Sequence, residues 1–100
     1  MAYLVINTIP PGEADDFAEK AVNEKAAACA TIIRDNTSFY WWQGKVNKEQ
    51  EDVILFKVSS KKMKKLMSYI KAHHPYDVPE IIAFQIDRIN KSYARWLVEN

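Results

Sequence analysis

The sequence predicts a single α+β domain spanning residues 1–100, with elements in the order β-α-β-β-α-β and one further helix at the C-terminal end. Three observations support this prediction. Apolar runs rich in β-branched residues alternate with segments of helical periodicity. Pro10-Pro11-Gly12 and Pro75 stop two of these segments. The chain of 100 residues is long enough to bury one core without a disulfide or a metal. The order is the ferredoxin-like arrangement, in which one antiparallel sheet carries both long helices on a single face.

The first half of the chain predicts a strand, a helix and a long hairpin. Residues 2–9 are an apolar, β-branched run that Pro10 and Pro11 stop, and residues 13–28 then show helical spacing with acidic residues in the first turn. Residues 29–46 predict a second strand with a bulge at Asp35 and Asn36. We expect the hairpin turn at residues 47–48 and the returning strand at residues 51–59. Because both arms exceed the usual strand of about 5 to 6 residues, the hairpin is expected to project beyond the domain.

The second half predicts a helix, a strand and a short final helix. Ser60 is the expected N-cap of the second helix, and Pro75 is expected to end it. The apolar residues of this helix recur at helical spacing: Met63, Leu66, Met67 and Ile70. Residues 81–86, IIAFQI, predict the fourth strand, and Asn90 is expected to cap the last helix.

Composition excludes several classes of protein. A formal net charge of +1 with 48% hydrophobic residues predicts neither a nucleic-acid-binding nor a membrane-spanning chain. The two glycines are too few for a phosphate-binding loop, and no local signature of a zinc protease, thiol oxidoreductase or serine hydrolase is present, so no enzymatic activity is expected. The single cysteine, Cys29, excludes an intrachain disulfide and is expected to be a buried packing residue. A reducing cytoplasm is the expected compartment.

The aromatic run FYWW predicts a partner surface. Phe39 and Trp41 are expected on one face of the strand, with Tyr40 and Trp42 on the other. Two helices cover only one face of a sheet, and soluble monomers rarely expose a large aromatic patch. We therefore expect a second subunit to cover these residues. The alternative is that the C-terminal helix folds across the open face of its own chain.

Motifs along almost the whole chain resemble one known family. They are Ala27-Ala28-Cys29, Thr37-Ser38-x-Tyr40-x-Trp42-x-Gly44-Lys45, Glu49-x-Glu51 with Lys57, His73-His74-Pro75-Tyr76 with Pro79-Glu80, and Tyr93 with Trp96-Leu97. This set is similar to the CutA divalent-cation tolerance proteins. The resemblance implies a ferredoxin-like homotrimer built by pairing strand edges, an architecture similar to the PII signalling proteins, reported copper binding and no established enzymatic activity. Because the chain begins almost directly at the first strand, the resemblance favours a cytoplasmic member.

Two interpretations of His73 and His74 are open. Imidazole is a good ligand for Cu(II) or Zn, and the two rings converge on one ion only if the helix unwinds before Pro75. Alternatively, His74 packs as a hydrogen-bonded residue and His73 interacts with the helix C-terminus. The resemblance implies that both histidines bind copper or another divalent ion. Asn7 lies where some members have a cysteine ligand, which implies a weaker, imidazole-based Cu(II) site.

The resemblance also implies a cleft between subunits. Its expected residues combine aromatic walls with charges of both signs: Tyr40, Trp42, Lys45, Glu49, Glu51, Lys57, Tyr76 and Glu80. We expect a small anionic or zwitterionic ligand, or a partner peptide, to bind there. The alternative is that these are ordinary solvated charges and packed aromatic pairs of a sheet.

Two functions therefore follow from the sequence. The first is a homotrimer that binds copper or another divalent metal in metal homeostasis. The second is a PII-like sensing or scaffolding trimer with an unidentified ligand or protein partner. RNA binding, which the ferredoxin-like order also serves, is disfavoured because the RNP1 pattern is missing and the net charge is only +1.

Overall fold

A computed structural model describes the whole chain, residues 1–100. The elements are β1 (Ala2–Ile9), α1 (Ala14–Asn23), β2 (Cys29–Trp42), β3 (Lys45–Ser59), α2 (Ser60–His73), β4 (Ile81–Gln85) and α3 (Lys91–Glu99). The predicted ferredoxin-like order with an added C-terminal helix is confirmed. None of the three helices has the combined length and apolar character needed to span a bilayer.

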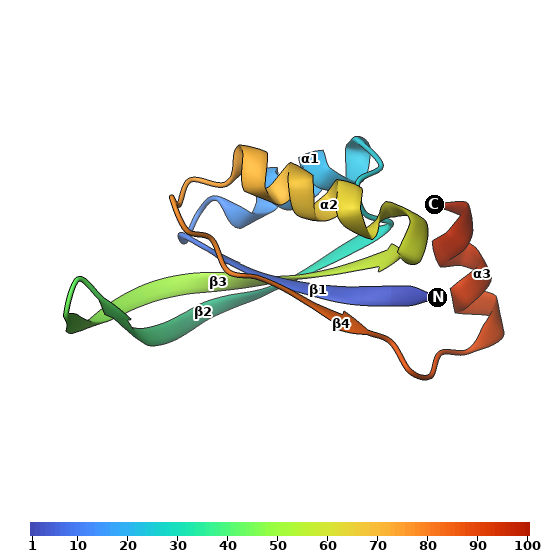
Figure 1. Cartoon of the computed structure of the whole chain (residues 1–100). Helices are drawn as coiled ribbons and strands as arrows, with labels where there is room; N and C mark the ends of the chain where they lie inside the picture. Colours follow the sequence, from blue (N-terminus) through green and yellow to red (C-terminus); the bar gives the residue numbers. More distant parts are fainter.

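One antiparallel sheet organises the molecule, with strand order β2-β3-β1-β4. Helices α1 and α2 lie together on one face of this sheet (Figure 1). The core forms between that face and the helices, where alternate residues of the central strands are fully buried, including Val5, Ile9 and Phe56. Leu66 and Ile70 of α2 meet them, as the helical spacing predicts. The hydrophobic core therefore buries only one face of the sheet.

The opposite face, which we call the open face, has no helix layer across it. The register pairs Leu4 with Phe84 and Ile6 with Ile82 on this face, because their neighbours Val5 and Ala83 point toward the helices. Phe84 is 53% exposed and Ile82 is 44% exposed. The open face thus presents apolar side chains to solvent.

The β2-β3 hairpin projects beyond the domain, as expected (Figure 1). The longest dimension of the molecule is 45 Å, against 26 and 22 Å for the others. The predicted turn at residues 47–48 is wrong: Gln43 and Gly44 form it, with φ of 51° and 80°. Two consecutive positive φ values are those of a type I′ turn, whose twist matches the paired strands. Asn47 instead pairs with Tyr40 within the ladder.

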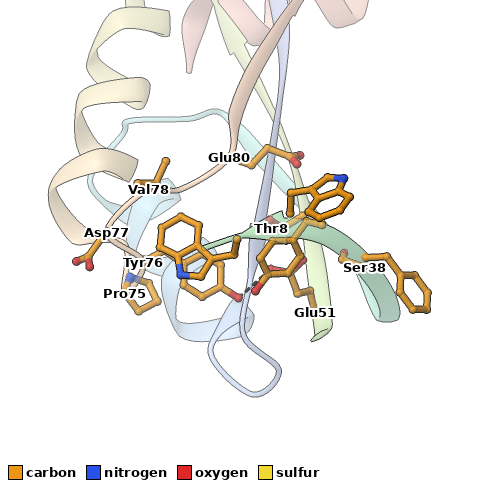
Figure 2. Close-up of a pocket in the computed structure, with 12 residues that line it drawn as sticks. Thr8, Ser38, Glu51, Pro75, Tyr76, Asp77, Val78 and Glu80 are labelled. Atoms are coloured by element: carbon orange, nitrogen blue, oxygen red, sulfur yellow. Dashed lines mark hydrogen bonds between the residues drawn. The ribbon is translucent and has the colours of Figure 1, made fainter. Parts of the chain in front are cut away.

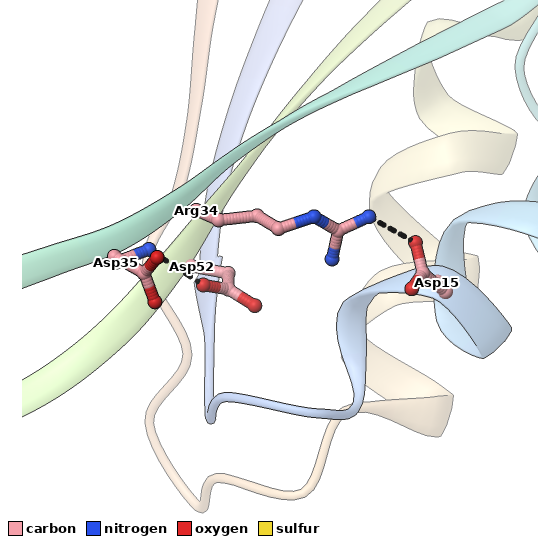
Figure 3. Close-up of polar contacts among 4 residues, drawn as sticks. All are labelled: Asp15, Arg34, Asp35 and Asp52. Carbon is pink, nitrogen blue, oxygen red and sulfur yellow. Dashed lines mark hydrogen bonds and ion pairs between the residues drawn. The ribbon is translucent and has the colours of Figure 1, made fainter.

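The predicted bulge in β2 is confirmed at Asp35. The pairing with β3 shifts between Ile33 and Asn36, and Asp35 has a φ of 62°. Asp52, which is 3% exposed, accepts a hydrogen bond from the Asp35 N–H over 3.0 Å. Figure 3 shows this contact beside an ion pair of 2.7 Å between Arg34 and Asp15 of α1. A buried carboxylate thus satisfies the backbone group that the bulge removes from the ladder.

The ends of α2 differ slightly from expectation. Ser59 rather than Ser60 holds the N-cap position, and its side chain makes no capping hydrogen bond. The helix ends at His73, and His74 is extended with φ −75° and ψ 142°. This conformation is the one that the following Pro75 favours, because proline disfavours the α region for the residue before it. The chain then leads into the segment between α2 and β4.

Helix α3 does not cover the aromatic run, so that alternative is wrong. The helix lies at the end of the sheet opposite the hairpin tip (Figure 1) and buries Leu97. Its Tyr93 has a raised pKa, because of burial and the neighbouring Cys29 thiol. Cys29 is half-buried rather than buried, since it lies at the start of edge strand β2. Phe39 and Trp41 are 66% and 74% exposed.

Candidate functional site

A cavity of about 770 Å³ lies where the hairpin meets the segment between α2 and β4. It is lined by Thr8 of β1, Ser38 to Trp42 of β2, Glu51 of β3, and residues 75–78 and Glu80 of the connecting segment. Figure 2 shows these side chains together, with residues of the connecting segment facing those of the strands. The volume is within the range of small-molecule sites, about 300–1,000 Å³. The cavity therefore combines residues from parts of the chain that are far apart in sequence.

The cavity includes five of the eight predicted cleft residues. They are Tyr40, Trp42, Glu51, Tyr76 and Glu80. Lys45, Glu49 and Lys57 do not line it, although the register places all three on the same face of β3 as Glu51. Within one chain, the cavity thus brings together the predicted aromatic residues and two of the three predicted glutamates, but neither of the two predicted lysines.

Lys57 lies away from the cavity for a simple geometric reason. It is six residues beyond Glu51 on the same strand, a separation of about 20 Å at about 3.3 Å per residue. Its Nζ donates to Oγ1 of Thr31 over 3.0 Å and lies 3.7 Å from Sγ of Cys29. Lys57 therefore belongs to the end of the sheet near α3.

Several lining residues were not predicted. Thr8, Asp77 and Val78 line the cavity, and neither their types nor their spacing resembles a motif. Their placement depends on the path of residues 75–80 along the sheet. Asn7 fixes one end of this path, since its Nδ2 donates to the carbonyl of Glu80 over 2.8 Å. No local sequence pattern indicates such a contact, because the two residues are 73 positions apart.

A hydrogen bond links the connecting segment to the sheet across the cavity. The Tyr76 hydroxyl donates to Oε2 of Glu51 over 2.8 Å (Figure 2). Burial raises the pKa of Tyr76 well above its usual value, and the hydrogen bond and negative charge of Glu51 raise it further. Burial and the charges of Glu49 and Glu51 also raise the pKa of Tyr40. The phenols of the cavity thus stay protonated beside a carboxylate.

The charge of the lining has one sign. Glu51, Asp77 and Glu80 supply carboxylates, and no Lys, Arg or His lines the cavity. The walls include the aromatic rings of β2 together with Tyr76. Carboxylates and aromatic faces both attract positive charge. Within one chain, the lining therefore favours a cationic ligand over the anionic or zwitterionic ligand expected from the sequence.

Both ring nitrogens of His74 have hydrogen-bonding partners. Nδ1 accepts the N–H of Tyr76 over 3.1 Å, so Nε2 carries the proton and donates to the carbonyl of Thr8 over 2.8 Å. Burial lowers the pKa of His74, although the bond to Thr8 and the charges of Glu13 and Glu51 oppose this. The ring also packs edge-on against Phe17, with 5.7 Å between centroids. His74 therefore has the packed, hydrogen-bonded position of the second interpretation.

His73 keeps one ring nitrogen free. Its Nδ1 lies 2.9 Å from the carbonyl of Tyr69, one turn earlier in α2, and its ring stacks on Tyr69 at 4.2 Å. A carbonyl accepts only from a protonated nitrogen, so the neutral ring presents an unprotonated Nε2. The His73 side chain is exposed and lines a second, smaller cavity with Glu13 and Asp16.

The two histidines do not form a chelating pair in this structure. His74 has no free nitrogen, and no group of three His, Cys, Asp or Glu side chains comes close enough to hold a metal ion. Asn7 is fully buried, and its Oδ1 has no hydrogen-bond partner. One imidazole, that of His73, fits the chemistry of a weak, solvent-facing metal contact. Metal binding at these residues stays a prediction.

Comparison with known proteins identifies the family. The family model described as CutA1 divalent ion tolerance protein matches residues 3–100. A Yersinia pestis (strain Pestoides F) protein named Divalent-cation tolerance protein CutA is 38% identical over 97 residues. The match covers 96% of this chain and 82% of the Yersinia protein.

Three solved structures of divalent-cation tolerance proteins have the same fold as this chain over almost its whole length. The divalent cation tolerance protein Cut A1 of Thermus thermophilus is 42% identical, with a TM-score of 0.94 over 100% of this chain and 98% of that one. CutA1 of Oryza sativa is 36% identical, with a TM-score of 0.93 over 98% and 91%. The periplasmic divalent cation tolerance protein CutA of Archaeoglobus fulgidus is 33% identical, with a TM-score of 0.93 over 99% and 97%. The chain therefore belongs to the CutA1 divalent ion tolerance protein family.

Proposed function

We propose that this protein contributes to divalent-cation tolerance as a homotrimer that binds ligands rather than transforming them. The family supports the link to divalent cations, since its members are described by tolerance and not by a reaction. The open face supports assembly, because it leaves the apolar Ile82 and Phe84 about half exposed. A closed oligomer removes such a face from water.

The total surface of the chain supports the same proposal. Its accessible area is 6712 Å², whereas a monomeric protein of this mass exposes about 5,800 Å². Part of the excess comes from the projecting hairpin, whose Phe39 and Trp41 are mostly exposed. Exposed aromatic residues are typical of the centre of a protein interface. The open face around Ile82 and Phe84 is therefore the surface that we propose other subunits cover, and the aromatic residues of the hairpin border the predicted cleft between subunits.

We propose that copper or another divalent ion binds this protein through His73. The bond from His73 Nδ1 to the Tyr69 carbonyl is the observation that supports the proposal. Histidines that bind metals usually donate their second ring nitrogen to such an acceptor, which fixes the tautomer and orients the ring. A single imidazole with solvent or a nearby carboxylate as co-ligand suits Cu(II) at modest affinity.

Calorimetric titration of the metal-free protein with Cu(II) tests this assignment. Single variants His73→Ala and His74→Ala separate the two imidazoles, with matched buffer and circular dichroism to confirm folding. The proposal expects saturable binding that His73→Ala abolishes and that a folded His74→Ala variant retains. Wild-type and His73→Ala proteins with the same binding isotherm would contradict it.

We further propose a cytoplasmic setting. Its support is the single Cys29, which has no intrachain partner with which to form a disulfide. The Archaeoglobus fulgidus relative is described as periplasmic, which is a different compartment from the one that we propose here. Fractionation of cells that express the native gene distinguishes the two: recovery in the periplasmic fraction would contradict the proposal.

A second candidate function is PII-like sensing or scaffolding, and the cavity favours it. The cavity has the size of a small-molecule site, and it brings Tyr76 of the connecting segment against Glu51 of the sheet. A ligand that changes this contact would alter the position of residues 75–80 on the surface. In this function the trimer reports the presence of a ligand to a partner.

A further inference from the structure

The cavity contains a carboxylate that no cation of its own chain neutralises. Glu51 is 6% exposed, and its Oε2 accepts the Tyr76 hydroxyl. The ion pairs of the chain are Lys20 with Asp16, Arg34 with Asp15, and Arg88 with Asp87, so Glu51 has no partner of opposite charge. A carboxylate held away from water is costly unless a positive charge or several donors compensate it. One Tyr hydroxyl is the only side-chain donor that reaches it.

The second oxygen of Glu51 is the atom open to a ligand. No donor of the chain bonds Oε1, and this atom is not among those fully closed off from solvent. Glu51 is also one of the residues that line the cavity. A donor that enters from the cavity therefore finds an unoccupied acceptor on a mostly buried charged group.

The walls around Glu51 add to the attraction for positive charge. Tyr40, Trp42 and Tyr76 contribute aromatic rings, and a cation over an aromatic face gains about 0.5 to 2 kcal/mol. Glu80 and Asp77 add two further carboxylates to the lining. An anionic ligand would meet repulsion from all three acidic residues.

We propose that this cavity binds a small organic cation, an ammonium or quaternary ammonium compound, with its charge against Glu51 and its apolar part against the aromatic rings. The proposal rests on the second candidate function and names the ligand class of that site. An organic cation satisfies Glu51 through one hydrogen bond or charge contact. A divalent metal needs several ligand atoms in a fixed geometry, and the acidic residues here do not converge as such a group.

Three probes of similar size and different charge test the ligand class: phenethylammonium, 2-phenylethanol and phenylacetate. Calorimetry and tryptophan fluorescence of the intact wild-type assembly measure their binding. The proposal expects saturable binding of phenethylammonium, with weaker binding of the alcohol and no binding of phenylacetate. Equal affinity for the three probes would overturn the proposal, and so would the absence of saturable binding of phenethylammonium.

Three variants test the role of Glu51. Glu51→Gln removes the charge and keeps an acceptor for Tyr76, whereas Tyr76→Phe removes the hydrogen bond and keeps the charge. Glu49→Gln is the matched control, because Glu49 lies on the same strand and face outside the lining. We expect Glu51→Gln to weaken phenethylammonium binding by about 30-fold or more, the usual cost of losing one partner of a buried charge pair. We expect changes of about threefold or less for Glu49→Gln, as for an exposed charge.

The outcomes separate this inference from the functions proposed above. Retained binding in a folded Glu51→Gln variant would overturn the role of Glu51. Binding of phenylacetate alone would overturn the cationic class and leave a sensing cavity in place. Displacement of phenethylammonium by stoichiometric Cu(II), with loss of copper binding in Glu51→Gln, would make the cavity a metal site and overturn the inference. Copper binding at His73 is tested separately and does not depend on these results.

Discussion

At the scale of single residues, hydrogen bonds determine which side chains remain available to a ligand. His74 uses both ring nitrogens within the fold, while His73 uses one. Glu51, which lines the cavity, has one oxygen bonded to Tyr76 and the other without a donor from the chain. The adjacent histidines therefore differ in their contacts: His74 attaches the connecting segment to β1, and His73 is the residue through which we propose that a metal binds.

The Tyr76–Glu51 bond gives a prediction about titration at high pH. The pKa of Tyr76 is raised, first by burial and then by Glu51. Because the folded value lies above the unfolded value of about 10, the stabilising contribution is complete below pH 10 and is lost as pH rises through the folded pKa. We expect Glu51→Gln to lower the pKa of Tyr76, since the negative charge of Glu51 no longer raises it, although burial and the charge of Glu49 still do.

Absorbance titration of the tyrosines measures this effect. The Tyr76→Phe variant serves as the reference, because it identifies the part of the absorbance change that belongs to Tyr76 among the 5 tyrosines. The absorbance change of Tyr76 should occur at higher pH in the wild type than in the Glu51→Gln variant. Titration curves of wild type and Glu51→Gln that superimpose would show that the hydrogen bond is absent in solution.

The chemistry of the site was only partly predictable from the sequence. The aromatic and acidic residues of the cavity belong to motifs that can be read directly, including Tyr40, Trp42 and Glu51. Motif membership does not give distance along a strand. Lys57 lies about 20 Å from Glu51 along β3 of the same chain, so its place in the cleft between subunits stays a prediction. Thr8 and Asp77 were missed because their position depends on the path of the connecting segment, which long-range contacts such as that of Asn7 with Glu80 determine.

At the scale of elements, the period of the hydrophobic pattern predicted every helix and strand, and turn chemistry was the weaker signal. The hairpin turn was misplaced because Asn47 resembles a turn residue, whereas Gln43 does not. The positive φ values at Gln43 and Gly44 show that the twist of two long paired strands overrides the preference of Gln. Local propensity therefore predicts that a hairpin forms, but it does not predict which residues make the turn.

The turn supplies a stability prediction. Gly44 has a φ of 80°, and an added Cβ would meet nothing within 4 Å, so only backbone strain opposes a side chain there. We expect Gly44→Ala to lower the free energy of unfolding by about 1 to 2 kcal/mol, the usual cost of a left-handed conformation. Gln43→Asn should instead raise it by a few tenths of a kcal/mol, because Asn-Gly is the favoured type I′ pair.

Urea unfolding at a fixed protomer concentration measures both variants, since stability depends on concentration in an oligomer. The opposite signs of the two effects provide the internal control. A Gly44→Ala protein as stable as the wild type would mean that the turn is not type I′.

The bulge in β2 supplies a second prediction, based on two contacts of different burial. Asp52→Ala removes the buried acceptor of the Asp35 N–H and should cost about 1 to 3 kcal/mol. Arg34→Ala removes an ion pair whose side chains are 53% and 72% exposed, and we expect little change in stability. Asp52→Asn, which keeps an acceptor oxygen, should retain most of the stability. Comparable losses in Asp52→Ala and Arg34→Ala would contradict the assignment of the buried contact as the anchor of the bulge.

At the scale of the whole molecule, the fold separates a covered face of the sheet from an open one. The two helices bury one face, while Ile82 and Phe84 remain on the other. The sequence predicted this imbalance, because two helices cannot cover both faces of a sheet with apolar residues on each side. Which copies meet, and at which edges, depends on contacts between chains that a single sequence pattern does not encode.

An interface prediction follows for the open face. We expect Phe84→Asp to dissociate the homotrimer, because it places a charge in a surface that assembly removes from water. Lys64→Asp is the matched control, since it introduces the same residue at an exposed position of α2, on the covered side of the sheet. A Phe84→Asp protein that keeps the wild-type mass would exclude this face from the interface.

Light scattering coupled to gel filtration of the wild-type protein tests the proposed assembly most directly. The open face and the projecting hairpin predict assembly, and the proposed homotrimer predicts a particle of three times the chain mass of 11.6 kDa, stable on dilution into the micromolar range. A particle with the mass of one chain at all concentrations would contradict the homotrimer. It would also require that the apolar open face stay in contact with water.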